Sequence, residues 1–149
     1  MSVARNIVFD PRLVPGGGAT EMAVAVGLAA KAKSINDVQQ WPYKAVGDAM
    51  EVIPRTLIEN CGASVVRILT QLRAKHASGE GSSWGVDGEQ GVIADMKTYG
   101  CWEPFAVKAQ TIKTAIEAAC LLLRVDDVLS GLSRKNADGG AGQAPPQEE

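Results

Sequence analysis

The 149-residue sequence contains a single histidine, His76, and three cysteines, at positions 61, 101 and 120. One imidazole excludes histidine-rich metal sites and leaves Ser-His-acid or Cys-His chemistry dependent on a single residue. The cysteines lie far apart and form no Cys-x-x-Cys pattern, which argues against a zinc site and against a disulfide framework. We therefore predict three reduced thiols and no hydrolase of the serine or cysteine type.

The sequence also lacks an excess of basic residues and a long hydrophobic run. Its 15 Lys and Arg residues against 17 Asp and Glu residues give a net charge of -2. This balance argues against nucleic acid as a partner, because no basic field attracts phosphates. The longest apolar run, residues 22–30, is about half the length that a bilayer span requires, and no signal-peptide pattern follows Met1. These absences predict a cytoplasmic protein without a membrane span.

An apolar content of 46% and a charged content of 21% are typical of one globular unit. Apolar residues at helical spacing predict helices that begin after Gly18, at Pro42, after Ser64 and at Pro104. Pro54 is expected to kink or restart the helix that begins at Pro42, because proline removes a backbone donor. The protein is thus expected to be mainly α-helical.

Four further segments complete the expected organisation. Residues 2–8 are typical of the last turns of a helix, and Asp87-Gly88 predicts the tight turn of a short hairpin within residues 84–96. The stretch 118–123, in the helix that begins at Pro104 and runs through residue 125, is apolar all round, which predicts burial on several sides. The polar, glycine-rich segment 131–149 predicts a disordered tail.

A glycine triplet at residues 16–18 precedes the first long helix. Glycines in this position allow backbone amides to approach a phosphate at the positive end of the helix dipole. The segment matches neither the P-loop nor the dinucleotide-binding fingerprint, in which Glu21 would have to be a third glycine. By itself the triplet is compatible with a phosphate-binding loop and with a purely structural loop.

Two further elements could contact a nucleotide. The turn Asp87-Gly88-Glu89 could present backbone groups to a flat base, although most Asp-Gly turns serve only the hairpin. Glu103 could accept hydrogen bonds from both hydroxyls of a ribose, with Lys108 about one helical turn later. An acid at the start of a helix is also explained by the helix dipole alone. The residues thus indicate a helical domain with a candidate nucleotide pocket.

Five blocks of the sequence resemble one known family in the same order. They are residues 10–21, around the glycine triplet, and residues 52–63, 72–76, 84–89 and 102–108. Together they are similar to the group II chaperonins, the cytosolic t-complex type also called CCT or TRiC. The resemblance runs from Ser2 to about Ser130, and ordered motifs over that span are far more specific than any one of them.

The resemblance implies a mainly α-helical fold with a short β-hairpin, the C-terminal part of a chaperonin equatorial (ATPase) domain. Residues 1–130 would form this portion and residues 131–149 the tail. It also implies ATP or ADP as the cofactor. The acid that binds the ribose in the family is matched by Glu103, and the glycine that lies against the nucleotide is matched by Gly17. The turn that borders the adenine is matched by Gly88 and Glu89.

Lys108 falls in the same family pocket, where it would reach the nucleotide or hold Glu103. Two second-rank members of the pocket are Asp87 and Gly16. The resemblance thus assigns nucleotide binding to seven residues, namely Gly17, Gly88, Glu89, Glu103, Lys108, Asp87 and Gly16. It assigns neither catalytic residues nor metal ligands to these 149 positions.

The family's Gly-Asp-Gly-Thr-Thr loop, which binds phosphate and magnesium, occurs nowhere in the sequence. The acid that positions the attacking water would precede Met1, and the apical substrate-binding domain is absent as well. We therefore expect a C-terminal fragment, a partial gene product or the product of an alternative start at an internal methionine, which hydrolyses no ATP by itself. Mg²⁺ is expected only together with the missing N-terminal half.

The resemblance implies part of an ATP-dependent chaperone subunit that assists the folding of cytosolic proteins such as actin and tubulin. Its partners would be other chaperonin subunits in a hetero-oligomeric double ring, and unfolded clients through the missing apical domain, with neither nucleic acid nor a membrane. The alternative is a truncated, noncatalytic interaction module that retains only ring-contact surfaces. Coding sequence upstream of Met1 with the Gly-Asp-Gly-Thr-Thr loop in frame would decide between these hypotheses.

Overall fold

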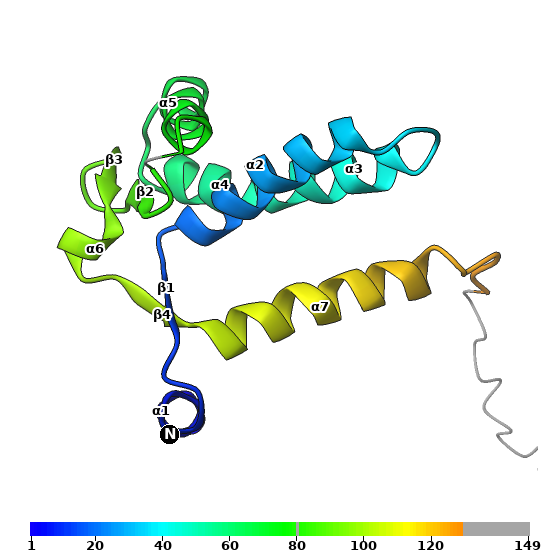
Figure 1. Cartoon of the computed structure of the whole chain (residues 1–149), viewed down its shortest axis with the longest axis horizontal. Helices are drawn as coiled ribbons and strands as arrows, with labels where there is room; N and C mark the ends of the chain where they lie inside the picture. The colour runs from blue at the N-terminus through cyan, green and yellow to red at the C-terminus, as the bar shows by residue number, and fades with distance from the viewer. Residues whose placement is uncertain (80, 130–149) are drawn as a thin grey trace, which may run out of the picture. The chain divides into compact units, whose positions relative to one another are not determined.

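A computed structural model describes residues 1–79 and 81–129 (Figure 1). The chain forms two units, residues 1–114 and the part from residue 115 onward. The predicted fold class, mainly helical with a short hairpin, is confirmed. The elements, in chain order, are α1 (Ser2–Phe9), β1 (Leu13–Pro15), α2 (Ala19–Ser34), α3 (Gln40–Met50), α4 (Val52–Asn60), α5 (Val65–Ala77), β2 (Trp84–Asp87), β3 (Val92–Asp95), α6 (Met96–Tyr99), β4 (Trp102–Pro104) and α7 (Phe105–Leu122).

The first unit is built around the alanine-rich helix α2. Ala19 and Met22 are fully buried, and Ala25 is nearly so. The small alanine side chains let neighbouring elements approach the helix closely. Helix α3 runs alongside α2 (Figure 1), and a Cβ on Gly47 would lie 3.4 Å from the Ala25 carbonyl oxygen. Helix α2 also contacts α4, α5, β1 and β2, as expected of a central helix.

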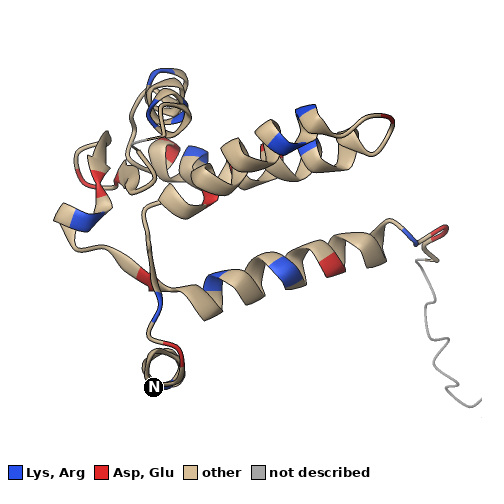
Figure 2. Cartoon of the chain, in the orientation of Figure 1, with Lys and Arg blue, Asp and Glu red and all other residues tan. Residues whose placement is uncertain are grey.

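One hydrophobic cluster joins α2, α4, α5 and β2. Its buried members are Met22, Ile58, Ile68, Leu69, Leu72 and Val86. Burying an aliphatic side chain of this size contributes about 1.5–3 kcal/mol, so this cluster is the main source of stability in the first unit. Acidic and basic residues are interspersed over the described helices and loops (Figure 2).

The helix predicted to begin at Pro42 has different bounds in the structure. It begins at Gln40, and the break falls at Glu51 instead of at Pro54. Pro54 occupies the first turn of α4, where a missing backbone amide removes no hydrogen bond within the helix. The proline therefore belongs to a restarted helix, one of the two outcomes expected. Its buried ring packs against the turn before α2, where a Cβ on Gly18 would lie 3.0 Å from it.

Strands β2 and β3 form the antiparallel hairpin predicted around Asp87-Gly88. The predicted tight turn is wrong, because Asp87 pairs with Val92 and residues 88–91 all lie in the connection. The Asp87 carboxylate accounts for this longer turn, since Oδ1 accepts hydrogen bonds from the backbone amides of Glu89 (2.8 Å) and Gln90 (3.3 Å). Gly91, with a φ of +63°, closes the turn.

A second antiparallel pair, β1 with β4, has no counterpart in the sequence predictions. Leu13 lies opposite Pro104, and Val14 lies opposite Glu103. The predicted start of the last helix at Pro104 is one residue early, because Pro104 ends β4 and α7 begins at Phe105. Strands of three residues show too little alternation to be recognised from sequence. This pair brings distant parts of the chain together beside the glycine triplet.

The second unit begins within α7. The predicted burial of residues 118–123 is wrong, because Leu121, Leu122 and Leu123 are 64%, 73% and 86% exposed. An all-round apolar segment is buried only where other elements pack on it, and residues 115–129 of this unit supply none. The helix ends at Leu122, three residues before the predicted end.

The predicted tail, residues 131–149, lies outside the described residues. Among residues 1–79 and 81–129, no helix is both long and apolar enough to cross a membrane.

Candidate nucleotide site

The glycine triplet forms a left-handed turn between β1 and α2. Gly17 and Gly18 have φ angles of +61° and +76°, which residues with a side chain rarely adopt. A Cβ on Gly17 would lie 2.5 Å from Met96 Sδ, and a Cβ on Gly16 would lie 2.7 Å from Cys101 Sγ. Both the backbone conformation and the close packing therefore require glycine here.

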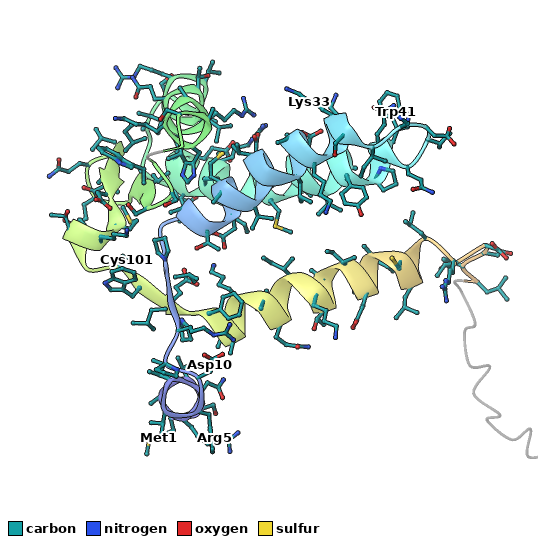
Figure 3. All side chains as sticks on the ribbon, in the orientation of Figure 1. Met1, Arg5, Asp10, Lys33, Trp41 and Cys101 are labelled. Atoms are coloured by element: carbon teal, nitrogen blue, oxygen red, sulfur yellow. The ribbon has the colours of Figure 1, made fainter. Side chains whose placement is uncertain are left out.

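Backbone hydrogen bonds join this turn to two other elements. The amide of Val86, on β2, donates to the Gly17 carbonyl at 2.8 Å. The amide of Gly16 donates to the carbonyl of Cys101 at 3.0 Å, and Cys101, labelled in Figure 3, immediately precedes β4. The glycine turn is thus held between the hairpin and the strand that carries Glu103.

Strand β4 places Glu103 directly beside the glycine turn. Glu103 Oε1 lies 3.2 Å from the position that a Cβ on Gly16 would occupy. Glu103 Oε2 forms an ion pair with Lys108 Nζ at 2.8 Å, and the Glu103 side chain is 37% exposed. The described residues supply no backbone hydrogen bond to this carboxylate, so Glu103 is not held as a helix cap. Its carboxylate is fixed in direction and remains accessible to a ligand.

Lys108 is also paired with Glu21 of α2, a residue that sequence analysis did not include in the site. Lys108 Nζ donates a hydrogen bond to Glu21 Oε1, and the Lys108 side chain is only 18% exposed. Burial acts to lower the pKa of Lys108, but the hydrogen bonds to Glu103 and Glu21 outweigh it and hold the pKa above its ordinary value. Lys108 is therefore an ammonium group shared by two carboxylates.

The hairpin turn follows Val86, which is hydrogen-bonded to the glycine turn. Asp87 is buried, and its carboxylate is occupied by the amides of Glu89 and Gln90. The Gly88 carbonyl accepts a hydrogen bond from Cys61 Sγ at 3.1 Å, which fixes the turn to the end of α4. A Cβ on Gly88 would meet no atom within 4 Å, so this part of the turn borders open space.

Tyr99, the last residue of α6, is a second neighbour that sequence analysis missed. The negative charges of Asp87 and then Glu89 raise the pKa of Tyr99, together with smaller effects of burial and of Cys101. The Tyr99 side chain is half exposed. A lone aromatic residue before a glycine carries no recognisable signal in the sequence.

Six of the seven predicted residues thus form two groups, and the seventh, Gly17, connects them through its hydrogen bond with Val86. The group around the Glu103 carboxylate consists of Gly16, Glu103 and Lys108. The group in the hairpin turn consists of Asp87, Gly88 and Glu89. In the described part of the chain, no three His, Cys, Asp or Glu side chains gather in a way that could hold a metal ion.

Comparison with known proteins bears on what this arrangement is for. The sequence model of the TCP-1/cpn60 chaperonin family matches residues 1–131. The chain belongs to this chaperonin family. It is 60% identical to T-complex protein 1 subunit gamma of Xenopus laevis across its whole length, 64% identical to that of Schizosaccharomyces pombe over 93% of the chain, and 59% identical to the human protein over 97%.

Residues 53–58 and 60–63 predict the gamma type among chaperonin subunits. These three relatives, all gamma subunits, confirm that prediction. The matched regions make up 28%, 26% and 27% of the three relatives, so the chain spans about a quarter of their length. Among solved structures, the open-state monomer of a group II chaperonin from Methanococcoides burtonii matches with a TM-score of 0.72 at 32% identity. That match covers 76% of this chain and 28% of the other, and it confirms the chaperonin fold.

Proposed function

We propose that this chain is part of an ATP-dependent chaperonin subunit and supplies the adenine and ribose side of its nucleotide pocket. The carboxylate of Glu103 is the observation that carries the proposal. Lys108 holds one oxygen, the glycine turn lies beside the other, and more than a third of the side chain is exposed. An ionised carboxylate in this state can accept hydrogen bonds from both ribose hydroxyls.

The glycine turn would let the nucleotide approach the backbone. A side chain on Gly16 would collide with Cys101 and crowd the Glu103 carboxylate. Gly17 has a positive φ that shapes the turn, and a side chain on it would collide with the buried Met96. In this proposal Gly17 lies against the nucleotide, and Gly16 leaves room for Glu103.

The hairpin turn would border the adenine. Gly88 faces open space, which leaves room for a planar base. Asp87 would act indirectly, because its carboxylate holds the amides of Glu89 and Gln90 and so fixes the shape of the turn. Glu89 would contribute its backbone carbonyl at the edge of the base, because its amide is bound to Asp87.

Phosphate and magnesium would be bound by residues outside this sequence. The sequence contains no Gly-Asp-Gly-Thr-Thr loop. The two acids beside the glycine turn, Glu21 and Glu103, already share the ammonium of Lys108, whose positive charge repels a metal cation. The residues present do not fit a magnesium site, and the chain alone is proposed to hydrolyse no ATP.

We further propose that residues 1–130 act as the C-terminal part of an equatorial domain in a cytosolic hetero-oligomeric double ring. The partners would be other chaperonin subunits, and the clients would include actin and tubulin. A truncated, noncatalytic interaction module is the second candidate. The exposed apolar side chains of α1 and of the end of α7 favour it, since such side chains are typical of contact surfaces; they include Val8, Phe9, Leu122 and Leu123.

The ribose-binding role of Glu103 can be tested with adenosine, which needs no phosphate-binding residues. A hydrogen bond to an ionised group contributes about 1.5–3 kcal/mol, so Glu103→Ala should weaken adenosine binding by roughly ten- to a hundredfold. Glu103→Gln should lose less, because the amide oxygen still accepts one hydrogen bond. Binding is measured by ligand-observed NMR titration of the 149-residue chain.

Thermal unfolding of the same variants separates this role from a structural one. A helix-capping acid predicts a loss of about 1 kcal/mol in stability with unaltered affinity for adenosine. That result would remove Glu103 from the site. A wild-type chain that binds no adenosine would overturn the proposed function itself.

A further inference from the structure

Glu21 is the most deeply buried charged residue beside the glycine turn. Its side chain is 6% exposed, and it lies in the first turn of α2, three residues after Gly18. Its Oε1 accepts a hydrogen bond from Lys108 Nζ, whereas Oε2, also buried, has no donor among the described residues. Within the described residues, Lys108 is therefore the one basic side chain that pairs with this buried carboxylate.

This arrangement restricts Lys108 strongly. A buried carboxylate without its partner is costly, so the Glu21–Lys108 pair is favoured over any conformation in which Lys108 turns toward solvent. A lysine has a flexible four-carbon side chain and would otherwise sample many positions. With Nζ fixed by Glu21 on one side, its ion pair with Glu103 Oε2, at 2.8 Å, holds that oxygen in one place.

We propose that Glu21 is a positioning residue of the nucleotide site, acting on the ribose through Lys108 and Glu103. Glu21 fixes the ammonium, the ammonium fixes one oxygen of Glu103, and the Glu103 carboxylate then meets the ribose hydroxyls in one orientation. This inference rests on the proposed function of Glu103. It adds that recognition of the ribose depends on Glu21, a buried residue 82 positions before Glu103 in the chain. In this proposal Glu21 does not itself touch the ligand.

A purely structural role makes a different prediction. If the Glu21–Lys108 pair only attaches α7 to α2, removing it lowers stability but changes affinity equally for ligands with and without ribose hydroxyls. If Glu21 positions Glu103, the loss falls on ligands that carry the hydroxyls. The informative quantity is therefore the ratio of the affinities for adenosine and 2′,3′-dideoxyadenosine.

The test measures this ratio for the wild-type chain and for Glu21→Gln, which keeps the shape of the side chain and removes its charge. We expect the wild type to prefer adenosine by about ten- to a hundredfold, the contribution of a hydrogen bond to a charged group. Glu21→Gln should reduce this preference about fivefold or more, while its affinity for the dideoxy compound stays within twofold of the wild type.

The matched control is Glu51→Gln. Glu51 is also a mostly buried acid, 13% exposed, that pairs with a basic residue, Arg73, on another helix. It lies at the junction of α3 and α4, away from the glycine turn. Glu51→Gln should reduce stability but leave the ribose preference unchanged, and an equal fall in both variants would overturn the inference.

A double variant keeps the test valid if Glu21→Gln does not fold, as judged by circular dichroism. Glu21→Gln combined with Lys108→Met leaves no unpaired buried charge between α2 and α7. Because Glu21 acts through Lys108, the double variant should have the same reduced preference as Lys108→Met alone. A further fall in the double variant would contradict the proposed route.

The outcomes separate this inference from the proposed function. If Glu103→Gln loses the preference for adenosine and Glu21→Gln keeps it, Glu21 is only structural and the inference is wrong. If the wild type shows no preference for adenosine, the ribose-binding role of Glu103 fails first, and the inference fails with it.

Discussion

Replacing Gly17 by alanine should be among the most damaging single changes near the site. The φ of +61° is a left-handed conformation that costs about 1–2 kcal/mol for a residue with a Cβ. The new Cβ would also lie 2.5 Å from Met96 Sδ and 3.1 Å from the Val86 carbonyl oxygen. Met96 is buried, so overpacking adds about 1–3 kcal/mol. We expect Gly17→Ala to reduce the free energy of unfolding by about 2–5 kcal/mol.

Urea titration of the chain at low protein concentration, followed by circular dichroism, measures this change. With a slope of about 2 kcal/mol per molar urea, the midpoint should fall by roughly 1–2.5 M. Gly27→Ala is the matched control, because Gly27 lies within α2 and a Cβ there would meet no atom within 4 Å. That variant should gain about 0.5–1 kcal/mol. Equal midpoints for Gly17→Ala and the wild type would refute the packing argument.

Three other outcomes are expected. The purified chain with magnesium and ATP should show no turnover above background. Turnover that Glu103→Ala abolishes would contradict the proposal that phosphate and magnesium are bound by residues outside this sequence. The chain should bind an apolar dye such as ANS and aggregate with rising concentration, because Phe9 and Leu123 are 81% and 86% exposed; a monodisperse, dye-free monomer would contradict this. The pKa of folded Lys108 lies above the ordinary 10.5, so its contribution to stability is complete below pH 10.5 and is lost as the pH rises through the raised pKa. The unfolding free energy of the wild type should therefore fall more steeply above pH 10.5 than that of Lys108→Met, and parallel curves would show that the ion pairs contribute nothing.

Sequence patterns predicted the fold where local chemistry decides it. The helix after the glycine triplet and the helix after Ser64 begin where their flanking residues indicate, and Ser64 is the N-cap residue of α5 although its side chain makes no capping hydrogen bond. The predictions failed where distant residues decide the structure. The β1–β4 pair depends on contacts between positions 13–15 and 102–104, which no local pattern reveals.

In the candidate site, too, some features follow from local sequence and others depend on distant residues. Glycine in a turn and an acid before a helix are weak local signals, and only the resemblance to chaperonins grouped them with Lys108. Glu21 could not be identified, because an acid in the first turn of a helix is explained by the helix dipole. Its burial and its pairing with Lys108 exist only once α2 and the start of α7 are in contact.

The pairing of Glu21 with Lys108 has a consequence for synthesis on the ribosome. The two residues are 87 positions apart. At about 5–20 residues per second, Lys108 is made roughly 4–17 s after Glu21. During that interval the start of α2 carries an acid whose counter-ion does not yet exist, and burying it then would be unfavourable. Helix α2 can therefore adopt its helical conformation early, but its first turn becomes a buried part of the structure only after the first turns of α7 have left the ribosome.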